Sequence, residues 1–171
     1  MKMRLEEKDL TLLTVGDIMV KKVFTVDADE SIRHAADLMS RHSIGCLVVT
    51  ENEAEGKIAG ILTESDILGR VVAVGANSGE TRVRVVMSRP LVIASPELPL
   101  EDAVRLMFVH KVKKLPVVKI EGESKRLVGL VTLTDIASVQ PALIATLKEL
   151  YEEKGELPPK RIKKVMNYYI V

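Results

Sequence analysis

The sequence Gly60-Ile61-Leu62-Thr63-Glu64-Ser65-Asp66-Ile67 occurs a second time, with changes, as Gly129-Leu130-Val131-Thr132-Leu133-Thr134-Asp135-Ile136. The match extends outward from these two strings, so that Val15 to Ile67 aligns with Val83 to Ile136 with one extra residue in a loop of the second copy. The period is longer than the roughly 20 to 50 residues of solenoid repeats. The sequence therefore predicts a domain built from two copies rather than a stacked array.

The bulk composition is that of an ordinary globular protein. The chain has 171 residues, of which 47% are hydrophobic, and this is enough to bury a sizeable core. Twenty-five basic against 24 acidic residues leave a net charge of +1, so no global field marks the chain as a binder of nucleic acid or membranes. No stretch approaches the roughly 20 apolar residues of a membrane span, and we expect no membrane partner.

Cysteine usage and the amino terminus bear on where the protein works. The single Cys46 excludes an internal disulfide framework, and its apolar flanks predict a buried thiol rather than a nucleophile. Because the start lacks the basic segment and apolar stretch of a secretory leader, we expect a cytoplasmic protein. Charged residues at 29%, with one glutamine and three asparagines, are typical of heat-adapted proteins, so we expect a thermophile.

Each copy repeats one order of elements: a short strand, a helix, two strands paired as a hairpin, and a second helix. Apolar residues at helical spacing predict the first helices, and Asp29 or Ser31 can cap one of them while Pro99 stands near the first turn of the other. The strands are expected at Val23 to Val26, Leu47 to Val49 and Lys57 to Leu62, and then at Leu91 to Ile93, Leu115 to Ile120 and Arg126 to Val131.

The repeat and its flanks divide the chain into five segments. They are an amino-terminal arm (1–13), a first repeat (14–75), a linker (76–82), a second repeat (83–140) and a carboxy-terminal helical extension (141–171). The linker is short, so the two halves are expected to pack together. In the extension, the spacing of Leu143, Ile144 and Leu147 predicts an amphipathic helix, which a basic cluster from Lys160 to Lys164 follows.

The repeated string places a hydroxyl at the end of a strand and a carboxylate in the first turn of a helix. An ionised Asp can accept two hydrogen bonds from the vicinal hydroxyls of a ribose, while Thr and free N–H groups at a helix start favour phosphate oxygens. The structural alternative is that Ser65-Asp66 and Thr134-Asp135 only cap helices. The occurrence of the string at matched positions in both copies favours a nucleotide site.

These residues resemble the tandem CBS domain, a pair often called a Bateman module. The resemblance covers Val15 to Val139 and rests on Gly60-x-x-Thr63-x-Ser65-Asp66, on Gly129-x-x-Thr132-x-Thr134-Asp135, and on the order of helices and strands. A further string, Val112-Lys113-Lys114-Leu115-Pro116-Val117-Val118, is also similar to the family, whereas Ile44 to Val49 of the first copy lacks the proline.

The resemblance implies an α/β (α+β) fold: a tandem CBS pair of two pseudo-symmetric small β-sheets, each flanked by helices, with helical arms at both ends. It also implies two ligand clefts, each mixing both copies, and assembly into a homodimer. The ligand-binding residues that it implies are Val23, Phe24, Ile44, Gly45 and Cys46 with Thr132, Thr134 and Asp135 for one cleft, and Leu91, Val92, Val112, Lys113 and Lys114 with Thr63, Ser65 and Asp66 for the other.

The function expected from this resemblance is regulatory and not catalytic. The module would sense AMP, ADP, ATP or S-adenosylmethionine, act as an energy sensor, require no resident cofactor, and signal to a downstream protein that the sequence does not identify. No phosphate-loop lysine, GxSxG or HExxH string assigns the chain a reaction. His42 and His110 stand at matched helix ends, where capping or phosphate contact is favoured over metal, so no metal site is expected.

Two points stay open at the level of sequence. Lys113 and Lys114 stand where the first copy has Gly45 and Cys46, so as a hypothesis the cleft with the lysines prefers nucleotides of higher charge. The alternative function is a regulator linked to nucleic acid, in which the basic segment from Lys160 to Lys164 contacts DNA or RNA and the clefts modulate that contact. A structural dimer with vestigial clefts is a third interpretation.

Overall fold

The computed structural model describes residues 13–51, 57–122, 124–154 and 168–170, and within them the fold is mixed α/β. The chain forms two compact units. The first-copy unit is Val23–Leu91, and the second-copy unit combines the residues up to Lys22 with Val92–Tyr169. Each contains a small sheet with its own helices, as the resemblance predicts.

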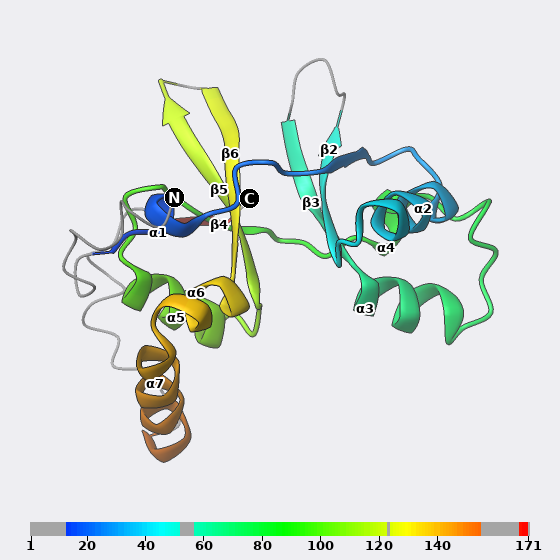
Figure 1. Cartoon of the computed structure of the whole chain (residues 1–171). Helices are drawn as coiled ribbons and strands as arrows, with labels where there is room; N and C mark the ends of the chain where they lie inside the picture. The colour runs from blue at the N-terminus through cyan, green and yellow to red at the C-terminus, as the bar shows by residue number, and fades with distance from the viewer. Residues whose placement is uncertain (1–12, 52–56, 123, 155–167, 171) are drawn as a thin grey trace. The chain divides into compact units, whose positions relative to one another are not determined.

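The first-copy unit is built around three strands in the order β1-β2-β3, with β1 parallel and β3 antiparallel to the central β2 (Figure 1). Its elements are β1 (Thr25–Asp27), α2 (Ile32–His42), β2 (Cys46–Glu51), β3 (Lys57–Thr63), α3 (Glu64–Ile67), the short π-helix η3 (Leu68–Val72) and α4 (Val83–Val86). β2 and β3 form the predicted strand pair. β2 extends beyond the predicted Leu47 to Val49 at both ends, and β3 ends one residue after the predicted Leu62.

The second-copy unit repeats this plan around β4, β5 and β6, with a further strand at the edge, in the order β6-β5-β4-β7. Its elements are α1 (Val15–Ile18), β4 (Val92–Ala94), α5 (Leu100–Val109), β5 (Lys114–Glu121), β6 (Ser124–Thr132), α6 (Leu133–Val139), α7 (Pro141–Lys154) and β7 (Tyr168–Ile170). The pairing of β5 with β6 shifts register between Val117 and Val118, at the position equivalent to the shift between Val49 and Thr50. The repeat in sequence is therefore a repeat in backbone geometry.

The two long helices begin as their sequences predict. Ser31 is the N-cap of α2, and its hydroxyl accepts a hydrogen bond of 3.2 Å from the N–H of His34. Pro99 stands immediately before α5, where a missing N–H is harmless. Both helices are followed by a residue with positive φ, Ser43 at 51° and Lys111 at 54°.

Each unit also contains the opening segment of the other copy. Val20, just after α1, pairs with Leu130 of β6, and Ser88, just after α4, pairs with Ile61 of β3. Both pairings are held by reciprocal N–H to C=O bonds of 2.8 to 3.2 Å. The start of each repeat thus adds a bridge to the outer strand of the sheet in its unit.

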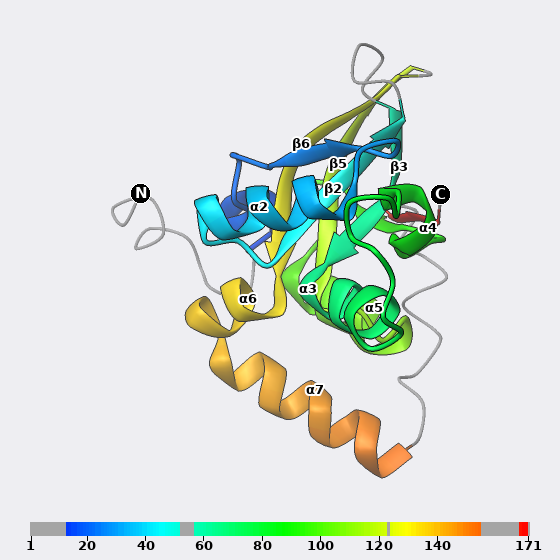
Figure 2. The same cartoon turned by 90° about the vertical axis from the view of Figure 1, so that its right-hand side faces the viewer.

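The cores are aliphatic, as the low aromatic content predicts. Leu47, Leu62 and Ile32 centre one core, and Leu115, Ile136 and Leu106 the other. The second-copy core has an added layer, because α7 packs against α5 and α6 and buries Leu147. Figures 1 and 2 show α7 starting beside α6 and running away from the strands of its unit. The predicted arm at 1–13, except the buried Leu13, and the basic segment lie outside the described residues.

Candidate functional site

The repeated string forms the same strand-to-helix corner in both units. The first corner is Thr63–Asp66, between β3 and α3, and the second corner is Thr132–Asp135, between β6 and α6. The Thr is the N-cap and the Asp is the third residue of the helix, so the two form a reciprocal capping box. The expected capping role therefore exists for Asp66 and Asp135, but their partners are Thr63 and Thr132, not Ser65 and Thr134.

The hydrogen bonds of the two corners agree within 0.1 Å. Oδ2 of Asp66 accepts from the N–H of Thr63 at 2.9 Å and from its hydroxyl at 2.7 Å, while the N–H of Asp66 donates to Oγ1 of Thr63 at 3.2 Å. The corresponding distances between Asp135 and Thr132 are 2.8, 2.7 and 3.1 Å. One carboxylate oxygen of each Asp is thus committed to the helix start, and Oδ1 is left for other partners.

The start of the hairpin lies next to each corner within the same unit. The N–H of Glu64 donates to the carbonyl of Gly45 at 3.3 Å, and Cys46 pairs with Thr63 in the sheet. In the second-copy unit the N–H of Leu133 donates to the carbonyl of Lys113 at 2.9 Å, and Lys114 pairs with Thr132. The structure therefore brings Gly45 and Cys46 to the first corner and both lysines to the second. Cys46 is buried, as predicted.

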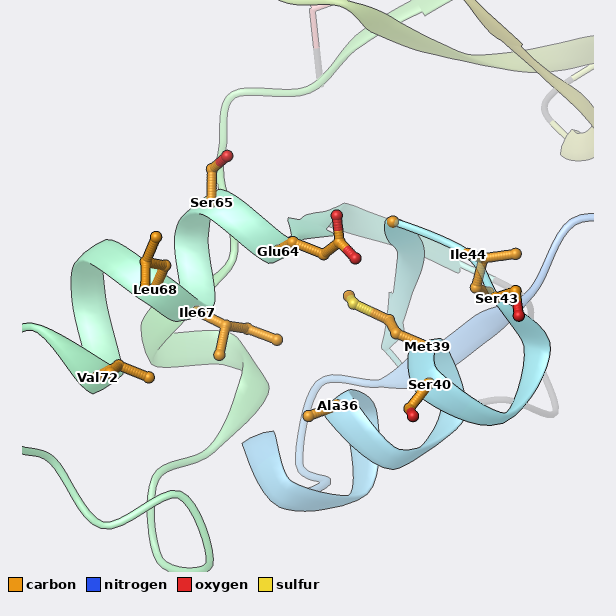
Figure 3. A pocket seen from close by; sticks show the side chains of 11 residues that line it. Ala36, Met39, Ser40, Ser43, Ile44, Glu64, Ser65, Ile67, Leu68 and Val72 are labelled. Atoms are coloured by element: carbon orange, nitrogen blue, oxygen red, sulfur yellow. The ribbon is translucent and has the colours of Figure 1, made fainter.

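An open groove of about 870 Å³ runs from the first corner between α2 and α3. It is lined by Ala36, Met39, Ser40, Ser43, Ile44, Gly45, Glu64, Ser65, Ile67, Leu68 and Val72. Figure 3 shows the side chains of Met39 and Glu64 pointing toward one another across the groove, whereas the Ser65 hydroxyl points away from them. Of the predicted site residues, Ile44, Gly45 and Ser65 line this groove.

A smaller pocket of about 410 Å³ lies at the second corner. It is lined by Lys113, Lys114, Thr132, Leu133, Thr134, Ala137 and Ile144. Ile144 belongs to α7, so the carboxy-terminal helix forms part of the wall of this pocket. The groove of the first-copy unit has no such helix in its described lining. Lys113, Lys114 and Thr134 carry donors of the kind that a phosphorylated ligand requires, whereas the Thr132 hydroxyl already donates to Oδ2 of Asp135.

Four of the remaining predicted residues lie at or near the strand before each first helix, whereas Val112 lies between α5 and β5. Phe24 is partly buried, and its ring centroid is 4.2 Å from that of the exposed His42. Leu91 and Val92 are buried, with Val92 in the second-copy core, while Val23 and Val112 are half-buried. The grouping of these residues into clefts that mix both copies stays a prediction.

The two corners differ in what surrounds the second carboxylate oxygen. Oδ1 of Asp66 accepts a hydrogen bond of 2.8 Å from the hydroxyl of Ser88, and Nη1 of Arg70 lies 3.4 Å from the same oxygen. Asp66 is 9% exposed, whereas Asp135 is less buried. The sequence interpretation missed Ser88 and Arg70. The signal that could have found Ser88 is a break in the repeat, because Met87-Ser88 stands where the first copy has Met19-Val20.

Among the described residues, no three His, Cys, Asp or Glu side chains gather closely enough to hold a metal ion. Nor does any helix in those ranges have the length and apolar character needed to cross a membrane.

The comparison with protein families agrees with the repeat. A family model described as CBS domain matches the chain twice, at residues 15–73 and 83–142. Over 124 residues the chain is 40% identical to the CBS domain-containing protein YhcV of Bacillus subtilis (strain 168), a match that covers 72% of this chain and 83% of YhcV.

Two solved structures show the same architecture. One is the CBS domain pair of protein MJ0100 in complex with methylthioadenosine and S-adenosyl-L-methionine, at a TM-score of 0.67 and 27% identity, covering 77% of this chain and 98% of that one. The other is a hexameric CBS-CP12 protein from bloom-forming cyanobacteria, at a TM-score of 0.65 and 30% identity, covering 74% and 71% respectively.

Proposed function

Because the chain belongs to the CBS domain family and carries two copies of the domain, we propose that it is a regulatory module that binds an adenosyl compound at its corners. The observation that carries this proposal is the duplicated Thr and Asp geometry, together with a groove or pocket at each corner that is lined by Ser65 in one unit and by Thr132 and Thr134 in the other. The similarity to the CBS pair of MJ0100, which is solved with two adenosyl compounds, supports this ligand class. The proposed role is non-catalytic.

The proposed contacts follow from the chemistry of each group. Oδ1 of Asp135 accepts a ribose hydroxyl, the Thr134 hydroxyl donates to a phosphate or to the corresponding substituent, and the lysine ammonium groups of the same pocket neutralise negative charge. The adenine lies against the apolar strand residues predicted from the sequence. AMP, ADP, ATP and S-adenosylmethionine all share the ribose and adenine on which this arrangement depends.

The proposed signal is a change in packing. A ligand that contacts residues of both copies is bound best by the arrangement in which those residues come together, so it shifts the population toward that arrangement by its differential affinity. A downstream protein that prefers one arrangement then reads the concentration of the ligand. No bond is broken in such a mechanism.

We also propose that the chain self-associates as a homodimer. Leu68 and Val72 of η3 are 64% and 63% exposed, and both line the open groove of the first-copy unit. Exposed aliphatic residues beside a groove favour burial against a partner surface. The mass in solution of a Leu68→Ser, Val72→Ser variant tests this: the variant should be smaller than the unmodified protein, and an unchanged mass would argue against the groove as interface.

A thermal-unfolding screen with AMP, ADP, ATP and S-adenosylmethionine tests the ligand class. A compound present at about 100 times its dissociation constant should stabilise the folded protein by roughly 2.7 kcal/mol. Guanosine compounds of equal charge serve as controls, because they share the ribose and phosphates but not the base. The proposal fails if none of the adenosyl compounds at millimolar concentration changes the melting temperature.

A further inference from the structure

The first corner contains a network of side chains that the capping box does not need. The hydroxyl of Ser88 donates to Oδ1 of Asp66 at 2.8 Å. Nη1 of Arg70 lies 3.4 Å from that oxygen and donates to the carbonyl oxygens of Val86 at 2.6 Å and Met87 at 3.2 Å. Asp66 is therefore tied through both oxygens, with Oδ2 to the helix start and Oδ1 to the segment that follows α4.

The second corner lacks the residues that make this network. Ser88 and Val20 are structurally equivalent, since each pairs with the matched strand residue, Ile61 in one unit and Leu130 in the other. Val20 has no hydroxyl, and the residue matched to Arg70 is Val139, which has no cation. Within the described residues, the hydrogen bonds to the Asp135 carboxylate all go to Oδ2.

We infer that Ser88 and Arg70 form a latch that reserves Asp66 for the fold, so that Asp135 alone supplies a carboxylate to the first ligand bound. This inference rests on the proposed function, and it adds to it that the two corners are unequal. We call the three side chains, Asp66, Arg70 and Ser88, the Asp66 latch.

Competition between the latch and a ribose gives the physical reason. At the first corner a ribose hydroxyl competes with the Ser88 hydroxyl for an oxygen of a carboxylate that is 9% exposed, so the net gain of the new hydrogen bond is small. At the second corner the same hydroxyl meets an oxygen that has no intramolecular donor among the described residues. The difference predicts tighter binding through Asp135 and one ligand of high affinity per chain.

Asparagine variants separate the capping role of each Asp from its proposed contact with the ligand, because an amide keeps one oxygen that can accept from the capping Thr. Isothermal calorimetry with AMP and with S-adenosylmethionine should give one tight site per unmodified chain. Asp135→Asn should weaken binding of the compound that binds by at least about tenfold, whereas Asp66→Asn should change it by less than about threefold. Equal losses in the two variants, or a greater loss for Asp66→Asn, would overturn the inference.

A swap between the matched positions tests the latch itself. Ser88→Val gives the first corner the residue of the second, and the affinity of a second, weaker site should rise, while Val20→Ser should weaken the tight site or leave it unchanged. If the affinity of the tight site falls in Ser88→Val but not in Asp135→Asn, the assignment of the tight site to Asp135 is wrong.

Melting temperatures of the unliganded variants test the Asp66 latch independently of ligand binding. A negative result for the latch can therefore be told apart from a negative result for the proposed function. In the unliganded protein, Ser88→Val and Asp66→Asn should each lower the melting temperature, while the matched Val20→Ser and Asp135→Asn should lower it less. If no adenosyl compound binds, the proposed function and the role of Asp135 both fall. If the matched variants melt at equal temperatures, the latch falls.

Discussion

Met87 lies across Gly60 so closely that a Cβ atom on the glycine would be 2.9 Å from the methionine sulfur, and Met19 covers Gly129 in the same way at 2.5 Å. Both pairs occur at matched positions of the repeat, one in each unit. The glycine of the repeated string is therefore needed in the middle of its strand, where the opening segment of the other copy crosses the sheet. Its function is close packing, since neither glycine has a positive φ.

The first prediction concerns these two glycines. Gly60→Ala and Gly129→Ala should each lower the free energy of unfolding by about 1 to 3 kcal/mol, because the new methyl group overpacks the crossing. Gly69→Ala is the control: nothing lies within 4 Å of its added Cβ, and its place in η3 makes alanine neutral or stabilising by up to about 1 kcal/mol. Urea unfolding followed by circular dichroism measures all three.

A second substitution sharpens this test. Met19→Ala should restore much of the stability of Gly129→Ala, because the three atoms nearest to the added Cβ all belong to the Met19 side chain. Met87→Ala should restore less in Gly60→Ala, because the Ser88 carbonyl oxygen, 3.0 Å from the added Cβ, belongs to the backbone and cannot move aside. Equal recovery in the two units would contradict the geometry.

The sequence predicted those features whose signal is local or repeated. The helices α2 and α5 followed from the burial period of residues such as Ile32 and Leu100, and the hairpins from apolar runs around turns. The helices α1 and α4 were missed because four residues make one turn and show no period. The exchange of opening segments was also missed, since pairing over long separations depends on the packed fold.

The candidate site also has parts that the sequence predicted and parts that depend on the packed fold. The repeated string predicted a hydroxyl at the end of a strand and a carboxylate in the first turn of a helix, and the structure has Thr63 and Asp66 there. The capping role was given to Ser65-Asp66, whereas Asp66 pairs with Thr63, because β3 extends one residue beyond the predicted strand. The bond from Ser88 to Asp66 joins residues 22 apart, so no local pattern signals it and only the break in the repeat at Ser88 points to that residue.

The second prediction concerns a buried guanidinium. Arg105 is 7% exposed, and its Nε and Nη2 donate to Oε1 of Glu101 at 3.2 and 2.5 Å. Glu101→Ala should cost about 1 to 3 kcal/mol, because a charged group in the core loses an acceptor. Asp37→Ala breaks an exposed pair with Arg41 that has the same i,i+4 spacing, and it should cost less than about 1 kcal/mol. Thermal unfolding compares them, and similar losses would contradict the role of burial.

The third prediction concerns the carboxy-terminal extension. Leu147 of α7 is 2% exposed in the second-copy core, so Leu147→Ala should destabilise the protein by about 2 to 5 kcal/mol through lost burial and a residual cavity. Leu68→Ala, at a position that is 64% exposed, should change the stability of the chain by less than about 0.5 kcal/mol. Urea unfolding at low protein concentration measures both without a contribution from self-association. A small effect of Leu147→Ala would show that α7 is not part of the core.

The fourth prediction concerns charge at the second corner. Lys113 and Lys114 line the pocket that contains Thr132 and Thr134, so their ammonium groups should attract phosphate oxygens more strongly as the number of phosphates rises. Replacing both lysines with alanine should weaken binding of ATP more than that of AMP and leave adenosine nearly unchanged, and the difference should shrink at high salt because exposed charges are screened. Lys148→Ala, which removes an exposed cation from α7, is the control and should not discriminate among the three compounds. Calorimetry measures each affinity. An equal loss for ATP, AMP and adenosine in the double variant would show that the lysines support the fold of the corner without reading the charge of the ligand.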